Sequence, residues 1–142
     1  MKIKMKAVYP TIFTETEKAI LVEVPDLEIL TEGKDIQDAI EMARDAIGLT
    51  GISMQAHGEP IPEPTDFKNI DVSKGTFAGD GESQLSLVDI DFDVYRRKID
   101  VKTVRRNVTL PNWLNREAEE AHINVSKVLQ EALIAKLGVN KY

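Results

Sequence analysis

The chain has 142 residues, of which 42% are hydrophobic and 30% are charged, a composition typical of a globular protein and not of a disordered segment. It has no apolar run near the ~20 residues of a spanning helix, and no cysteine, which excludes disulfides, thiolate metal sites and a cysteine nucleophile. The lysines near the N-terminus alternate with apolar residues, and the continuous apolar stretch of a signal peptide does not follow them. We therefore expect a cytoplasmic protein with no membrane association.

Charge is divided unevenly along the chain. Residues 1–94 carry 8 Lys and Arg against 19 Asp and Glu, a net charge of −11, whereas residues 95–142 carry 10 against 5, a net charge of +5. A basic tail on an acidic body is compatible with nucleic-acid binding by the tail. Uneven solvation of two surfaces would produce the same split, so charge alone does not decide the function.

The first part of the chain predicts three strands. Residues 3–9 alternate apolar and polar side chains with the period of a half-buried strand. After a polar turn at 15–18, the apolar run 19–24 reads as the return strand of a hairpin. Pro25 ends that strand, and residues 27–31 are predicted to form a third one.

A helix and a fourth strand follow. Asp35 is a suitable N-cap, the apolar residues after it recur at helical spacing, and Gly48 and Gly51 are plausible stops. Residues 55–83 hold Pro and Gly-Asp-Gly turn signals and predict a loop. Residues 84–95 alternate apolar and mostly acidic side chains and predict a strand. The first domain is therefore expected to be β-β-β-α-β over residues 1–95.

A basic linker over 96–101 is expected to join this domain to a second one over 102–142, so that the fold class is α+β. In the second domain the pattern predicts one strand at 104–110, a helix from Pro111 to about His122, and a helix over 125–137 that Gly138 ends. A β-α-α unit of this size cannot bury a stable core, and its lone strand would leave both edges unpaired. Pairing two copies solves both problems, and the resulting two-stranded ribbon fits the major groove of DNA.

The strand alternation assigns candidate DNA contacts. Arg105, Asn107 and Thr109 project away from the apolar side and can read guanine, adenine and thymine edges. At the start of the second helix, Asn124 is a good N-cap, and free N–H groups there, with Ser126 and Lys127, can hold a phosphate. A capped core helix and a solvated polar strand face remain the alternative interpretation.

The ordered set of Asn107 to Leu110, Pro111, Asn124 to Ser126 and Leu129 to Leu133 resembles the ribbon-helix-helix repressors of the MetJ and Arc type, over about residues 102–139. The resemblance implies dimerisation through the C-terminal domain and binding of operator DNA.

The first domain resembles HicB-type antitoxins over roughly residues 3–95. The resemblance rests on Tyr9, the Val24-Pro25-Asp26-Leu27 turn, Thr31 to Gly33, the Asp35–Ala46 helix and Ile61-Pro62-Glu63-Pro64. It implies a partial ribonuclease-H-like domain that neutralises a HicA-type toxin, a small RNA-cleaving protein. It also implies an antitoxin that represses its own operon and can assemble with the toxin into a higher-order complex.

An acidic domain would complement a basic, RNA-binding toxin. Candidate toxin contacts surround the turn and the helix start: Asp26, Glu28, Glu32, Asp35 and Asp38. A second candidate is the row Asp89, Asp91 and Asp93 on the fourth strand. For any one of these residues, a solvated surface charge is the alternative.

Two other functions stay open. A metal-dependent nuclease would need converging acids, usually starting on the first strand, but residues 3–13 contain none and the two histidines lie apart from any acid motif. We therefore expect no enzyme activity, no catalytic residues and no metal. A ligand-sensing ribbon-helix-helix repressor without a toxin partner would need a ligand site, and no Gly-rich phosphate loop or aromatic box is present. No cofactor is expected.

Overall fold

The computed structural model describes residues 6–139, and the chain divides into two compact units at Arg96. The strands and α-helices within that range are β1 (Lys6–Glu15), β2 (Ile20–Val24), β3 (Ile29–Gly33), α1 (Ile36–Ala56), β4 (Glu82–Asp91), α2 (Phe92–Ile99), α3 (Asn112–Glu120) and α4 (Val125–Leu137). The predicted order β-β-β-α-β of the first unit is confirmed. Residues 3–5 of the expected first strand lie outside the described part of the chain.

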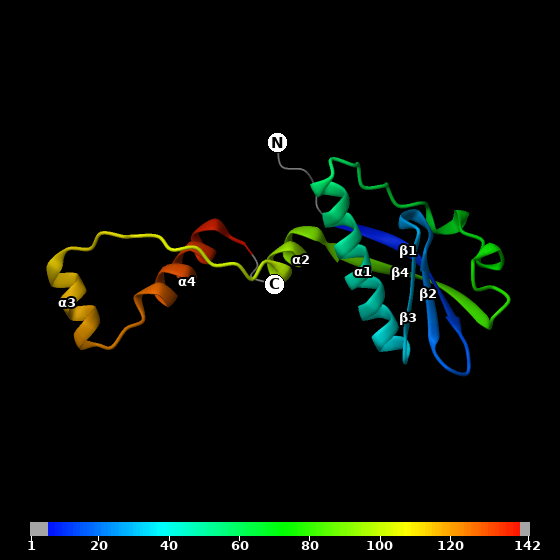
Figure 1. Ribbon diagram of the computed structural model, residues 1–142, viewed down its shortest axis with the longest axis horizontal. Helices are drawn as coiled ribbons and strands as arrows, with labels where there is room; N and C mark the ends of the chain where they lie inside the picture. Colours follow the sequence, from blue (N-terminus) through cyan, green and yellow to red (C-terminus); the bar gives the residue numbers. More distant parts are fainter. Residues whose placement is uncertain (1–5, 140–142) are drawn as a thin grey trace. The chain divides into compact units, whose positions relative to one another are not determined.

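The first unit is a two-layer α+β arrangement. Its four strands form one antiparallel sheet in the order β3-β2-β1-β4, and α1 lies along one face of it (Figure 1). The alternation of each strand places one set of side chains toward α1. That set and the inner face of α1 form the core together with Leu27 of the turn between β2 and β3 and with Phe92 and Tyr95 of α2. The buried core residues are Tyr9, Phe13, Val22, Val24, Leu27, Ile29, Ala39, Ala43, Ile47, Val88, Ile90, Phe92 and Tyr95.

The prediction that Gly48 and Gly51 stop the first helix is wrong, because α1 continues to Ala56. Both glycines are buried and face aromatic rings of α2. A Cβ at Gly48 would stand 2.6 Å from Tyr95, and a Cβ at Gly51 would stand 2.3 Å from Phe92. Their role is therefore to admit these rings, not to end the helix.

The predicted fourth strand over 84–95 is also too long. It ends at Asp91, whose carboxylate accepts hydrogen bonds from the backbone N–H groups of Asp93 and Val94, both at 3.1 Å. This side chain satisfies N–H groups at the start of α2, as an N-cap does. Beyond Asp91, the buried residues are Phe92 and Tyr95, whose spacing of three is that of a helix and not of a strand. The expected linker over 96–101 consequently begins as part of α2.

The long segment between α1 and β4 contains two 3-10 turns, η2 (Phe67–Asn69) and η3 (Val72–Lys74). Hydrogen bonds join it at three places to β1, to β2 and to the turn between β2 and β3. The Tyr9 hydroxyl donates to the Pro62 carbonyl at 2.7 Å, and Thr65 donates to the Asp26 carboxylate. Thr76 donates from its backbone and its hydroxyl to Glu23, at 2.9 and 2.6 Å. The segment predicted as a loop is therefore anchored along its length.

The second unit contains α3 and α4. The helix predicted over 125–137 has those bounds; Asn124 caps it by accepting from the Lys127 N–H at 3.1 Å, and Gly138 ends it with φ of +63°. The strand predicted at 104–110 is not formed, because the segment has no ladder partner in a single chain. None of the helices within residues 6–139 has the length and apolar character needed to cross a membrane.

Candidate partner-binding surfaces

The second unit leaves its apolar side chains uncovered. From residue 97 to residue 139, no residue is buried, and Trp113 and Leu137 are 63% and 69% exposed. The other large apolar side chains exposed there are Ile99, Val101, Val104, Val108, Leu110, Leu114, Ile123, Val128 and Leu133. An apolar surface of this extent marks an interaction site in a folded protein.

The six residues expected to contact DNA are all exposed in the single chain: Arg105, Asn107, Thr109, Asn124, Ser126 and Lys127. The first three lie in the segment before α3, which is not paired with a strand on either side. The last three are at the N-terminus of α4, where the Asn124 side-chain oxygen is engaged in the cap. Its side-chain amide and the remaining N–H groups of the first turn can still donate to an anion.

Three of the five acids expected to contact a toxin hold the fold of the first unit. The Asp26 carboxylate accepts from the backbone N–H of Thr65 at 2.9 Å and from its hydroxyl. Asp35 caps α1 by accepting from the Asp38 N–H at 2.8 Å, and Asp38 in turn accepts from the Lys34 N–H at 2.9 Å. These acids specify the β2–β3 turn and the start of α1.

Glu28 and Glu32 are the two members of that set whose side chains are exposed and make no hydrogen bond or ion pair within residues 6–139. Glu28 follows the 3-10 turn η1 (Pro25–Leu27) with φ of +54°, and Glu32 lies on the edge strand β3. They are free to meet a basic partner.

The second candidate set, Asp89, Asp91 and Asp93, makes contacts within the first unit. Asp89 forms an ion pair with Arg44 of α1 at 3.0 Å, and Arg44 Nε also donates to the Asp89 carbonyl at 3.1 Å. Asp91 caps α2, and Asp93 faces Arg96 at 3.7 Å. This row contributes to holding α1, β4 and α2 together.

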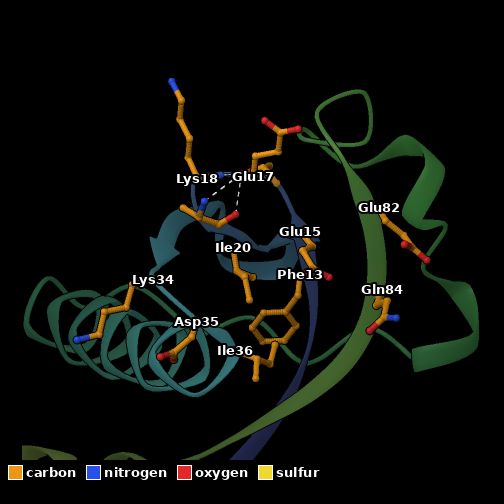
Figure 2. A pocket seen from close by; sticks show the side chains of 12 residues that line it. Phe13, Glu15, Glu17, Lys18, Ile20, Lys34, Asp35, Ile36, Glu82 and Gln84 are labelled. Carbon is orange, nitrogen blue, oxygen red and sulfur yellow. Dashed lines mark hydrogen bonds between the residues drawn. The ribbon is translucent and has the colours of Figure 1, made fainter.

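A pocket that the sequence did not predict lies at the N-terminus of α1. Its volume is about 500 Å³, and Phe13, Ile20 and Ile36 gather at its floor (Figure 2). The charged and polar residues that line it are Glu15, Thr16, Glu17, Lys18, Lys34, Asp35, Glu82 and Gln84. The only sequence signal was the polar turn at 15–18, because the pocket depends on the pairing of β1 with β4.

No cluster able to bind a metal ion is found among the described residues. No three His, Asp or Glu side chains of residues 6–139 converge in that way. Asp26 and Asp89, two acids of the first unit, are instead engaged by Thr65 and Arg44. His57 ends α1, with its Nδ1 at 2.7 Å from the Ser53 carbonyl oxygen, and His122 has φ of +54° in the turn after α3. Within residues 6–139, neither histidine is paired with an acid.

Comparison with known proteins identifies the family of the chain and solved structures with a similar fold. Residues 9–137 match the family described as HicB-like antitoxin of bacterial toxin–antitoxin system. The structure is similar to a chain of a toxin–antitoxin complex from Streptococcus pneumoniae, with a TM-score of 0.59 and 23% identity over 93% of this chain and 99% of that chain. It is also similar to the antitoxin HicB of Burkholderia pseudomallei, with a TM-score of 0.50 and 24% identity over 93% of this chain and 97% of that one. No curated protein sequence matches the chain.

Proposed function

The chain belongs to the HicB-like antitoxins of bacterial toxin–antitoxin systems, and from this membership we propose a division of labour between its two units. The first unit, a partial ribonuclease-H-like domain, binds and masks a HicA-type toxin that cleaves mRNA. The second unit, a ribbon-helix-helix domain over residues 102–142, dimerises and represses the operon by binding operator DNA. The protein has no catalytic role of its own.

The observation that carries the proposal for the second unit is that it has no buried residue between 97 and 139. A unit with two helices, α3 and α4, and no buried core needs a partner to bury its apolar side chains. A second copy supplies both missing features at once, because it covers the helices and provides the ladder partner for residues 104–110. Two-stranded ribbons of this kind fit the major groove.

Within such a dimer, the exposed polar residues take distinct roles. Arg105, Asn107 and Thr109 lie on the ribbon and read base edges, whereas Asn124, Ser126 and Lys127 lie at the N-terminus of α4 and hold the phosphate backbone. The net charge of +5 over residues 95–142 adds a favourable interaction with DNA of any sequence.

The acidity of the first unit supports a basic partner. Residues 1–94 carry a net charge of −11, and Glu28 and Glu32 have no internal partner among the described residues. A protein that grips RNA presents a basic surface, and opposite net charges accelerate the encounter of two proteins. The solved structure from Streptococcus pneumoniae, to which this chain is similar, is a toxin–antitoxin complex, which supports a toxin partner here.

Co-purification tests the proposal. The tagged full chain is expressed together with the product of the neighbouring reading frame, and an antitoxin retains a small basic protein whose ribonuclease activity it suppresses. A neighbouring product that does not bind, or that cleaves RNA equally well in the complex, contradicts the antitoxin assignment.

A further inference from the structure

Two carboxylates of like charge stand directly opposite each other in the sheet. Glu15 is the last residue of β1 and pairs with Glu82, the first residue of β4. Both side chains line the same pocket, and neither makes a hydrogen bond or an ion pair within the described range 6–139. Like charges directly opposite in an antiparallel pair are destabilising, so a bound cation would reduce the repulsion between these two carboxylates.

The pocket next to this pair has an apolar floor. Phe13, two residues before Glu15 on the same strand, is buried, and Ile20 of β2 is half-buried. Ile36, the first residue of α1, is 52% exposed and completes the floor. Figure 2 shows these three side chains close together, with Glu15 beside them on β1, and with Gln84 and the outward-extending Glu82 on β4.

The lysines that line the pocket do not neutralise the pair. Lys18 and Lys34 extend away from the floor in Figure 2, and neither forms an ion pair among the described residues. An apolar floor below unpaired carboxylates suits a long side chain that has an aliphatic stem and a positive head.

We propose that this pocket receives an arginine side chain of the basic toxin. The inference rests on the proposed function and names the partner group that the first unit recognises. The stem and guanidinium plane pack on Phe13, Ile20 and Ile36, while the guanidinium donates to Glu15 and Glu82. Arginine fits better than lysine, because its planar guanidinium group offers five hydrogen-bond donors and stacks on aromatic rings. A metal ion fits less well, since no group of three ligands converges there within residues 6–139.

The first test needs no toxin. The full chain, labelled with ¹⁵N, is titrated with L-argininamide and, in parallel, with L-citrulline amide, which has the same shape and lacks the guanidinium charge. Saturable shifts confined to the amides around Phe13, Glu15, Ile36 and Glu82 are expected with L-argininamide alone. Equal shifts with both compounds, or shifts spread over the acidic surface without saturation, overturn the proposal.

A pair of double variants then connects the pocket to the toxin. Glu15→Gln with Glu82→Gln removes both carboxylates, and Glu41→Gln with Glu59→Gln removes the same charge from exposed positions outside the pocket. The pocket variant should keep or raise the melting temperature, because it relieves repulsion, and should lose L-argininamide binding. Its affinity for the neighbouring gene product should fall roughly tenfold or more, against roughly threefold or less for the control.

The outcomes distinguish a failure of the pocket proposal from a failure of the proposed antitoxin function. If both variants bind the toxin equally well, the pocket proposal is wrong and the antitoxin function stands. If the unaltered chain binds no neighbouring product, the antitoxin function is wrong, and the L-argininamide titration still decides whether the pocket binds a guanidinium group.

Discussion

Gly51 of α1 lies directly against the ring of Phe92, the first residue of α2, so closely that a Cβ on Gly51 would stand 2.3 Å from Phe92 Cε1. One turn earlier, Gly48 lies against Tyr95 in the same way. The Tyr95 hydroxyl also donates to the Asp45 carboxylate. The two glycines thus form a notch in α1 into which Phe92 and Tyr95, from the start of α2, pack.

Replacing Gly51 by alanine should destabilise the first unit, although the same change stabilises most exposed helices. The added methyl group overlaps the Phe92 ring, and overpacking of this kind costs about 1–3 kcal/mol of the free energy of unfolding. Urea unfolding of G51A measures the loss. Gly79→Ala is the matched control, because a Cβ at Gly79 has nothing within 4 Å. A G51A protein as stable as the unaltered chain would contradict the notch, and combining G51A with Phe92→Leu should recover part of the loss.

Local chemistry explains which elements the sequence could predict. Asp35, Asn124 and Gly138 determine helix ends through contacts with residues three or four positions away, and all three were predicted correctly. The continuation of α1 past Gly48 was not predictable, because it depends on aromatic rings of α2 that pack against α1. The pocket depends on the pairing of Glu15 with Glu82, which are distant in sequence.

The surfaces were harder to predict than the fold, because acidity does not distinguish a free carboxylate from a structural one. Asp26, Asp35 and Asp38 resembled Glu28 and Glu32 in the sequence, yet only the first three accept hydrogen bonds that hold turns and helix starts. The expected strand over 104–110 is not formed in the single chain, where the segment has no ladder partner.

Stability at alkaline pH should depend on Tyr9. Burial, and then the negative charges of Asp26 and Glu63, raise the pKa of its phenol from 10.0 to about 12. As the pH rises, the phenol therefore ionises in the unfolded chain before it ionises in the folded one. The contribution of Tyr9 to the free energy of unfolding is complete below about pH 10 and is lost as the pH rises toward 12. The pKa of Tyr95 is raised as well, by burial and by its hydrogen bond to Asp45, so it adds to the same decline.

Tyr9→Phe should cost about 1 kcal/mol at neutral pH, because it removes the hydrogen bond to the Pro62 carbonyl. The difference from the unaltered chain should shrink above about pH 10, where the unaltered chain loses the contribution of Tyr9 and the variant has none to lose. Urea unfolding at about pH 8 and about pH 11 measures both quantities. A constant difference across this range would show that Tyr9 does not titrate as described.

The apolar stripe of α4 should hold the dimer together; it consists of Val125, Val128, Leu129, Ala132, Leu133 and Leu137. Leu133 is half exposed in the single chain, and Leu133→Asp should place a charge in the dimer interface, giving a monomer that no longer binds operator DNA. Gln130→Ala, on the same helix and outside the stripe, should leave both properties unchanged. Sedimentation at micromolar concentration and gel shifts provide the readouts. An unaltered chain that sediments as a monomer with its second unit folded would exclude the ribbon-helix-helix assignment.

Base and phosphate contacts should respond differently to substitution. Asn107→Ala should cost about 1–3 kcal/mol per base contact and relax the preference at one operator position. Lys127→Ala should weaken binding to all sequences alike and lower the slope of affinity against salt by about one for each phosphate that the variant no longer neutralises. Titrations on operator and scrambled DNA at several salt concentrations separate the two effects. If Asn107→Ala leaves operator preference intact, the polar side chains of this segment are only a solvated strand face.

The division of labour between the two units is tested most directly by removing residues 100–142, which leaves α2 complete. The truncated protein and the full chain are each titrated into an RNA-cleavage assay of the neighbouring gene product, and operator binding is measured beside it. We predict that the truncated protein suppresses cleavage at the same molar ratio as the full chain and does not bind the operator. A folded truncated protein that fails to suppress cleavage, or that still binds the operator, would contradict the assignment of toxin masking to the first unit and DNA binding to the second.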